Sequence, residues 1–257
     1  VGVTLSPFLM SIALGNSNNW QGGYKTMFFF QLALTIICFA SLPVWKRVKE
    51  QKSEEEETRV VPVCELLSIP IARASLVIYF GSCAIESVCL AWGSTFLVNS
   101  KGLTPEKAAQ MITFYFIGMT LGRFLSGVLV NKISPKSIIV IGESITLVAI
   151  ILTFAGNSKI AGTGLFLIGL GNGPIFPNMT HLTPIHMGRD VSQSFIGLQG
   201  AVSYGSILLS PITFGLLAQN LTTDIFSIFL IIAWIITVVS TFIMLKYSKS
   251  TQLTVDK

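Results

Sequence analysis

The chain has 257 residues, of which 51% are hydrophobic and 11% are charged, and its formal net charge is +5. So apolar a composition is far from that of soluble globular proteins and indicates a chain that lies mostly in a lipid bilayer. A large soluble helical protein is disfavoured, because nearly every apolar segment lacks a polar face for water.

The apolar runs predict an all-α integral membrane protein with about eight transmembrane helices. A run of about 20 residues can cross a hydrocarbon core about 30 Å thick at about 1.5 Å per residue. A shorter run opens the chain at 1–14, and the longer ones are 26–45, 69–98, 108–130, 138–155, 162–177, 195–218 and 225–245.

The loops between these runs differ in charge. Thirteen of the 17 lysines and arginines fall on one side of the expected membrane. Cytoplasmic loops carry such an excess, so we expect a multi-pass protein of the cell membrane with a cytoplasmic C-terminus. This asymmetry accounts for the positive charge without a nucleic-acid partner.

The stretch KRVKEQKSEEEETRVVP, residues 46–62, is the long polar segment of the sequence. Its mixed charges predict a solvated, partly disordered linker. We therefore divide the chain into two helices at 1–45, a cytoplasmic linker at 46–68, six helices at 69–248 and a short cytoplasmic tail at 249–257.

A short repeat relates the first helix to the seventh. The tripeptide Leu-Ser-Pro that ends at Pro7 recurs ending at Pro211, and each copy leads toward an Asn-bearing loop. Two six-helix halves joined by a charged loop resemble the major facilitator transporters. The resemblance implies a twelve-helix fold of which this chain would hold helices five to twelve, the last two of the N-half and the six of the C-half.

Glu86 lies near the middle of the apolar run 69–98. An isolated carboxylate is costly there, so we expect it to be protonated, paired or facing a wet cavity, and able to carry a proton. Trp92, six residues on, lies about 120° further around the helix and could stack on a sugar. A purely structural Glu86, bonded to a neighbouring helix, is the alternative.

The segment 118–142 contains the pattern G-R-x-x-x-G-x-L-x-N-K-x-x-x-K, which resembles a signature that major facilitator proteins carry between the second and third helix of each half. Small residues there would let backbones approach closely. The resemblance implies a polar latch at the cytoplasmic end, although asparagine stands where the signature usually has an acidic residue. Ordinary packing with positive-inside charges is the alternative. The residues concerned are Gly118, Gly122, Arg123, Gly127, Asn131, Lys132 and Lys136.

The stretch GLGNGPIFPNMTHLTP, residues 169–184, interrupts an apolar run with glycines and prolines. No preceding strand and no lysine support a phosphate-binding loop. Broken membrane helices line cavities, so we expect a bend at a pore, or else a kinked packing helix. Asparagine amides in this stretch can hydrogen-bond to hydroxyl groups, and an aromatic ring can stack on the face of a sugar. The break residues are Gly169, Gly173, Pro174 and Pro177, and the solute-facing candidates are Asn172, Phe176 and Asn178.

Other polar residues give weaker signals. His181 and His186 lie in a polar exit segment interrupted by proline, so we expect no metal site. Arg189 belongs to the expected cytoplasmic gate, where Glu143 could pair with it or with Arg123. Gln199 is a further cavity candidate.

The pattern Y-x-G, then Glu86 and Trp92, then FIGMTLGRFLSG, resembles the fucose permease branch of the superfamily. That resemblance implies sugar transport coupled to protons by alternating access, in a monomeric protein without cofactors. The sequence shows no His-Glu-x-x-His, no serine nucleophile with a paired base and no cysteine-rich cofactor site, so we do not expect an enzyme. Two alternatives remain open: efflux of amphipathic compounds by the same fold, or a non-transporting sensor or inactive truncated product.

Overall fold

The computed structural model describes residues 20–53 and 61–255. The predicted short first helix, with Pro7, lies outside these residues. The described residues contain helices and no strands, and seven helical segments among them are long and apolar enough to cross a membrane. The chain divides into two units between Thr58 and Arg59, and each is described by itself.

The first unit contains the helix α2 (Trp20–Ser53), whose apolar part, Tyr24–Trp45, matches the predicted run 26–45. The helix continues past Trp45 to Ser53, into the first part of the segment that we predicted to be a solvated, partly disordered linker. Lysine, arginine, glutamate and glutamine dominate there without Gly or Pro, and these residues extend a helix readily.

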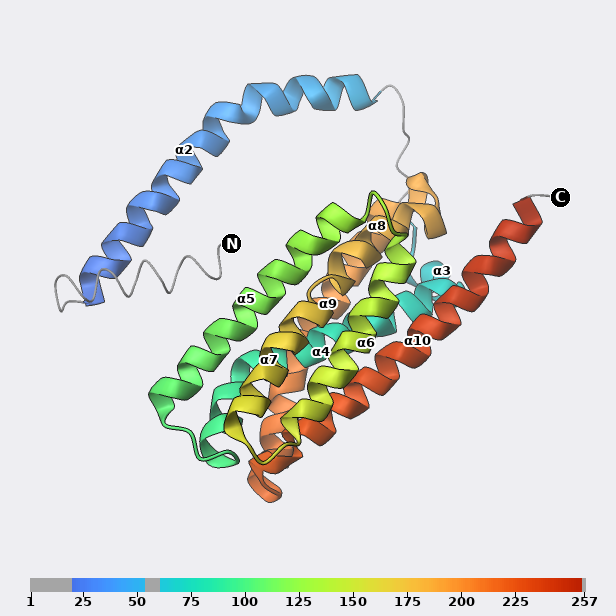
Figure 1. Cartoon of the computed structure of the whole chain (residues 1–257). Helices are drawn as coiled ribbons and strands as arrows, with labels where there is room; N and C mark the ends of the chain where they lie inside the picture. The colour runs from blue at the N-terminus through green and yellow to red at the C-terminus, as the bar shows by residue number, and fades with distance from the viewer. Residues whose placement is uncertain (1–19, 54–60, 256–257) are drawn as a thin grey trace. The chain divides into compact units, whose positions relative to one another are not determined.

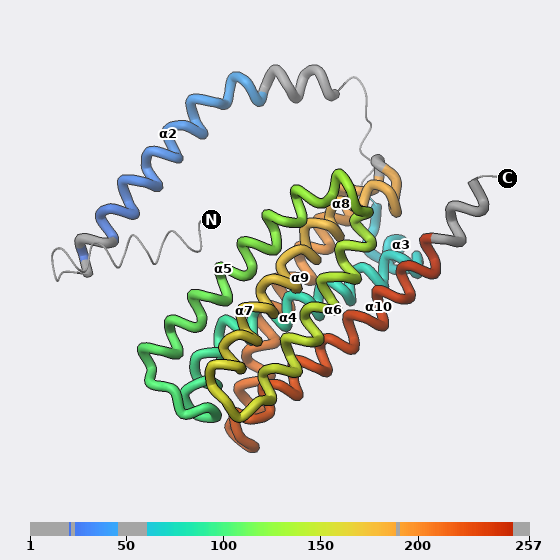
Figure 2. The backbone as a smooth tube through the Cα atoms, viewed as in Figure 1, coloured from blue at the N-terminus to red at the C-terminus, as the bar shows by residue number. Residues whose placement is uncertain are grey.

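The second unit is a bundle of long helices (Figures 1 and 2). The helices α4, α5 and α6 agree with the predicted runs within a few residues, because the hydrocarbon thickness sets the length of an apolar run. The later helices extend further, with α8 ending ten residues beyond the run 162–177 and α10 ten residues beyond the run 225–245. A short helix, α3 (Val63–Ser68), precedes the bundle, and a 3-10 turn, η1 (Thr223–Ile225), precedes its last helix. The long elements are α4 (Pro70–Asn99), α5 (Pro105–Leu129), α6 (Pro135–Thr153), α7 (Ser158–Asn172), α8 (Ile175–Met187), α9 (Arg189–Asn220) and α10 (Phe226–Val255).

Local sequence sets the helix starts. Pro70, Pro105 and Pro135 each stand in the first turn, where the missing N–H costs nothing. The Asn157 side chain accepts a hydrogen bond from the Lys159 N–H and caps α7. Gly188 separates α8 from α9 with a φ of 84°, which a residue with a side chain rarely adopts.

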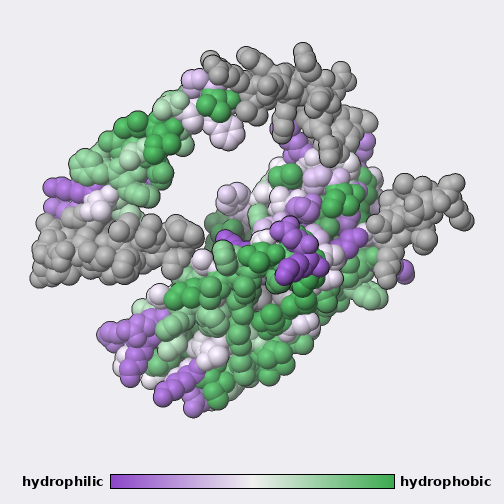
Figure 3. Space-filling view, turned by 45° about the horizontal axis from the view of Figure 1, so that its top comes forward, coloured by the Kyte–Doolittle hydropathy of each residue, from purple (hydrophilic) through white to green (hydrophobic). Residues whose placement is uncertain are grey.

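The helices α4 and α7 form the interior of the bundle. α4 packs mainly against α9 and α10, and α7 packs against α5 and α6. The largest core joins α4, α5, α7 and α10 around Phe96, Tyr115, Leu165 and Phe226. Figure 3 shows hydrophobic residues over the middle of one face of the bundle and hydrophilic ones toward its ends, as a bilayer-spanning protein requires.

The backbones of α5 and α7 lie very close together. A Cβ atom at Gly122 would overlap the carbonyl oxygen of Leu170, and one at Gly118 would overlap that of Phe166. Gly127 differs from the expectation, since no described atom lies within 4 Å of where its Cβ would stand. The close approach therefore involves the part of the signature that precedes Gly127.

Candidate functional site

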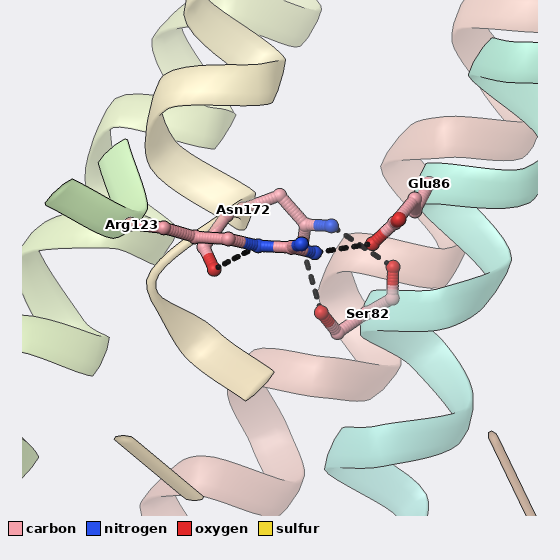
Figure 4. Close-up of polar contacts among 5 residues, drawn as sticks. Ser82, Glu86, Arg123 and Asn172 are labelled. Carbon is pink, nitrogen blue, oxygen red and sulfur yellow. Dashed lines mark hydrogen bonds and ion pairs between the residues drawn. The ribbon is translucent and has the colours of Figure 1, made fainter. Parts of the chain in front are cut away.

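A polar cluster lies inside the bundle where α4, α5 and the end of α7 meet (Figure 4). Glu86 and Ser82 are four residues apart on α4 and share one helix face. Arg123 reaches Glu86 from α5, and its Nη2 lies 3.5 Å from the Glu86 Oε2. The side chains of Arg123 and Glu86 are 45% and 25% exposed, so the ion pair is open on one side of the described bundle.

Ser82 and Asn172 form the buried part of this cluster. The Ser82 hydroxyl donates to the Asn172 Oδ1 at 3.0 Å, and the Asn172 Nδ2 donates to the Ser82 carbonyl at 3.0 Å. Both side chains are buried. The pair fixes the last residue of α7 against the middle of α4.

The helix interruption falls at Gly173 and Pro174, between α7 and α8. Proline has no N–H, so Pro174 and Pro177 leave the carbonyls of Leu170 and Gly173 without their ordinary helical donors. The Arg123 Nε donates to the Gly173 carbonyl at 3.4 Å. One guanidinium thus contacts both the intramembrane carboxylate and the broken helix.

Beyond the break, α8 is held by neutral contacts. The Asn178 Nδ2 donates to the Ser126 Oγ on α5 at 2.6 Å and to the Pro174 carbonyl at 2.7 Å. The Tyr79 hydroxyl on α4 shares a 2.7 Å hydrogen bond with the Thr180 hydroxyl. Phe176 is 39% exposed and packs edge-on against the ring of Tyr79.

The amides expected to face a solute have protein partners in this conformation. Asn172 is bonded to Ser82, Asn178 to Ser126, and the buried Gln199 on α9 donates to the Thr183 hydroxyl at 2.9 Å. Each amide therefore joins two helices, because a buried amide without a partner would be costly.

Trp92 lies apart from the cluster. Its indole N–H donates to the Pro211 carbonyl on α9 at 3.0 Å, and its ring packs edge-on against Phe214. Glu86, by contrast, faces Arg123 on α5. The two α4 residues thus contact different neighbouring helices, in keeping with their separation around the helix.

The structure corrects the expected cytoplasmic latch. Arg123 stands six residues before the end of α5, about 9 Å inside the helix at 1.5 Å per residue, and contacts Glu86. Glu143 does not pair with Arg123, because it lies on the α6 face that packs against α10. There its carboxylate accepts from the Thr241 hydroxyl, and its carbonyl accepts from the Trp234 indole at 2.8 Å.

The remaining latch candidates are spread over the ends of α5, α6 and α9. Asn131 and Lys132 are exposed in the turn between α5 and α6. Lys136 donates from its Nζ to the Ser248 hydroxyl on α10. Arg189 begins α9, and its side chain lies outside the described residues.

Sequence reasoning missed several members of the site. Ser82 precedes Glu86 by four residues and Ser126 follows Arg123 by three, so helical spacing from the charged residues could have found both. Tyr115 on α5 lies in the largest hydrophobic core, and its buried hydroxyl has no hydrogen-bond partner among the described residues.

An open pocket lies elsewhere, between α5 and α7. Its volume is about 440 Å³ and it shares no lining residue with the polar cluster. Apolar surface dominates it, which suits a lipid-facing depression better than a polar solute site. Its lining residues are Met111, Phe114, Lys159, Gly162, Thr163 and Phe166.

Comparison with protein families gives one match, to the model of the Major Facilitator Superfamily, over residues 1–211 and again over 76–255. Among solved structures, the chain is similar to PepTSo, a transporter of the POT family. The TM-score is 0.60 at 17% identity, over 70% of this chain and 37% of that one. A likeness at this identity concerns the fold alone.

Curated relatives are similar at low identity. The chain is 25% identical over 199 residues to a Helicobacter pylori protein named "Putative glucose/galactose transporter", covering 77% of this chain and 47% of that protein. A second H. pylori protein of the same name is 28% identical over 48% of this chain and 28% of its own length. The Bacillus subtilis protein YfkL, an uncharacterized MFS-type transporter, is 28% identical over 98% of this chain and 64% of its length. The chain thus covers less than half of the first two relatives.

Proposed function

Because the chain belongs to the Major Facilitator Superfamily, we propose that it serves in the transport of a sugar across the cell membrane, coupled to protons. The observation that carries this proposal is the ion pair between Glu86 and Arg123 inside two membrane-spanning helices. Charged groups in such segments are costly and mark transport or proton pathways. We further propose that one polypeptide acts alone, with its C-terminus in the cytoplasm.

The proposed proton carrier is Glu86. A proton on its carboxylate removes the charge that holds Arg123, and an unprotonated Glu86 attracts the guanidinium again. Because the two halves of such a fold expose a central site alternately, a change in this pair biases which side is open.

The proposed substrate class is a hexose. Each of the three buried amides is hydrogen-bonded to a hydroxyl group. Asn172 accepts a hydrogen bond from the Ser82 hydroxyl. Asn178 donates to the hydroxyl of Ser126, and Gln199 donates to that of Thr183. A sugar offers the same chemical group, so exchanging one neutral hydrogen bond for another costs little. The names of the two H. pylori relatives support this choice. The exposed face of Phe176 supplies a surface on which a sugar ring stacks.

The test is uptake of labelled glucose and galactose by the intact transporter in proteoliposomes with an imposed pH gradient. We expect accumulation against the sugar gradient when the lumen is alkaline. Glu86→Gln abolishes that accumulation but retains exchange of labelled for unlabelled sugar. Glu106→Gln is the matched control, since Glu106 is an exposed carboxylate in the first turn of α5.

Three results would overturn the proposal. Transport of an amphipathic dye in place of sugar would indicate efflux. Absence of exchange for any sugar would indicate a sensor or an inactive protein. Gradient-driven accumulation that survives Glu86→Gln would exclude Glu86 as the proton carrier.

A further inference from the structure

We propose that Arg123 is a positioning residue that transmits the charge on Glu86 to the break between α7 and α8, through the carbonyl of Gly173. The inference rests on the proposed function only in requiring that Glu86 gains and loses a proton. It assigns to Arg123 a role that the transport signature, which implies a latch at the cytoplasmic end, does not contain.

The first step concerns the acceptor at the break. In a continuous helix the Gly173 carbonyl would accept from the N–H of residue 177, but that residue is proline. The carbonyl is therefore available to a donor from another helix. Arg123 supplies one from its Nε at 3.4 Å.

The second step concerns the shared donor. The guanidinium is a rigid plane, so its Nε and Nη2 cannot move independently. Its contacts with Gly173 and Glu86 measure 3.4 Å and 3.5 Å, longer than the usual 2.7–3.2 Å of a strong N–H···O bond. A small displacement of the plane toward one acceptor therefore weakens the other contact, and the two acceptors compete for one group.

The third step concerns what can move. Asn172 is fixed to α4 by two hydrogen bonds with Ser82, so the near side of the break is anchored. The far side, α8, is held by neutral hydrogen bonds to three other helices, those of Thr180 to Tyr79 on α4, Asn178 to Ser126 on α5 and Thr183 to Gln199 on α9. Because Arg123 is the charged partner at the break, a change in its contact with Gly173 acts on the angle between α8 and the anchored end of α7.

The experiment measures this coupling without any sugar. Spin labels are placed on the intact protein at Val128 near the end of α5 and at Ile185 near the end of α8, both exposed, in a background without native cysteines. Electron paramagnetic resonance then gives the distance between the labels with and without Glu86→Gln, which mimics a protonated carboxylate. We expect Glu86→Gln to shift that distance.

The decisive variant is Pro177→Ala, which restores an N–H for the Gly173 carbonyl and leaves Glu86 and Arg123 unchanged. We expect the shift caused by Glu86→Gln to be lost in this background. Pro184→Ala is the matched control, because Pro184 also lies inside α8 but its freed carbonyl would be that of Thr180. In the Pro184→Ala background we expect Glu86→Gln to shift the distance between the labels as before.

Arg123→Lys provides a second variant if Pro177→Ala alters folding. A single ammonium on a flexible stem cannot present two fixed donors to Glu86 and Gly173, so the shift is again lost. An undiminished shift in Pro177→Ala or Arg123→Lys would overturn the inference, as would its absence in the unaltered background or its loss in Pro184→Ala. Failure of sugar uptake alone would reject the proposed substrate and leave this coupling intact.

Discussion

Ser82 and Asn172 hold each other by two hydrogen bonds across α4 and α7, one from hydroxyl to amide oxygen and one from amide nitrogen to backbone carbonyl. This reciprocal pair anchors the point from which the broken helix departs. It also lies beside the ion pair of Glu86 and Arg123 in Figure 4. Its loss should therefore be measurable as lost stability of the bundle.

We expect Ser82→Ala to lower the free energy of unfolding by about 1–3 kcal/mol, because the buried Asn172 Oδ1 loses its donor. Thermal unfolding of the detergent-solubilised protein measures this. Ser144→Ala is the control, since the exposed Ser144 hydroxyl bonds only to Val140 of its own helix in the described structure. Equal melting of the two variants would contradict the anchoring role.

The close approach of α5 and α7 gives a second prediction. Gly122→Ala forces a methyl group into the Leu170 carbonyl, and such overpacking costs about 1–3 kcal/mol. Gly127→Ala meets no described atom and should be neutral or stabilising by up to about 1 kcal/mol, because alanine favours the helix. The melting temperatures of the two variants therefore compare two glycines of α5, of which only Gly122 lies against α7. A larger loss at Gly127 would reject this packing.

The buried hydroxyl of Tyr115 gives a third prediction. It has no partner among the described residues, so Tyr115→Phe removes a group that contributes no hydrogen bond there. We expect unchanged or higher stability. Tyr79→Phe is the matched change, and it should cost about 1 kcal/mol because the bond to Thr180 disappears. Marked destabilisation by Tyr115→Phe would reveal a partner for that hydroxyl.

The contact of Glu143 with Thr241, between α6 and α10, gives a fourth prediction. Thr241→Val removes the hydroxyl that donates to its carboxylate while keeping the side-chain shape. We expect a loss of about 1–3 kcal/mol in unfolding free energy, since the carboxylate is buried. Thr241→Ser retains the donor and should lose less. Identical melting of both variants would show that the hydroxyl does not stabilise α6 against α10.

The sequence by itself determined the features that depend on local chemistry. Hydropathy located the membrane spans, because the bilayer thickness sets how many consecutive apolar residues a helix needs. Glycine and proline together indicated the break at Gly173 and Pro174, because glycine favours the helix weakly and proline removes one of its N–H donors. Proline alone is not sufficient, since Pro184 and Pro211 lie inside α8 and α9. Glu86 was a candidate functional residue because a carboxylate inside the membrane is energetically costly.

Only the tertiary structure decided which polar groups meet. Arg123 belonged to a signature that suggested a cytoplasmic latch, yet α5 lies so that it reaches Glu86 and Gly173. Glu143 looked like a gate residue, yet its face of α6 packs against α10. Partners of this kind depend on how each helix is rotated and packed against residues distant in the chain. Helical periodicity fixes which residues share a face, whereas the neighbour of that face is chosen by the packing of the whole bundle.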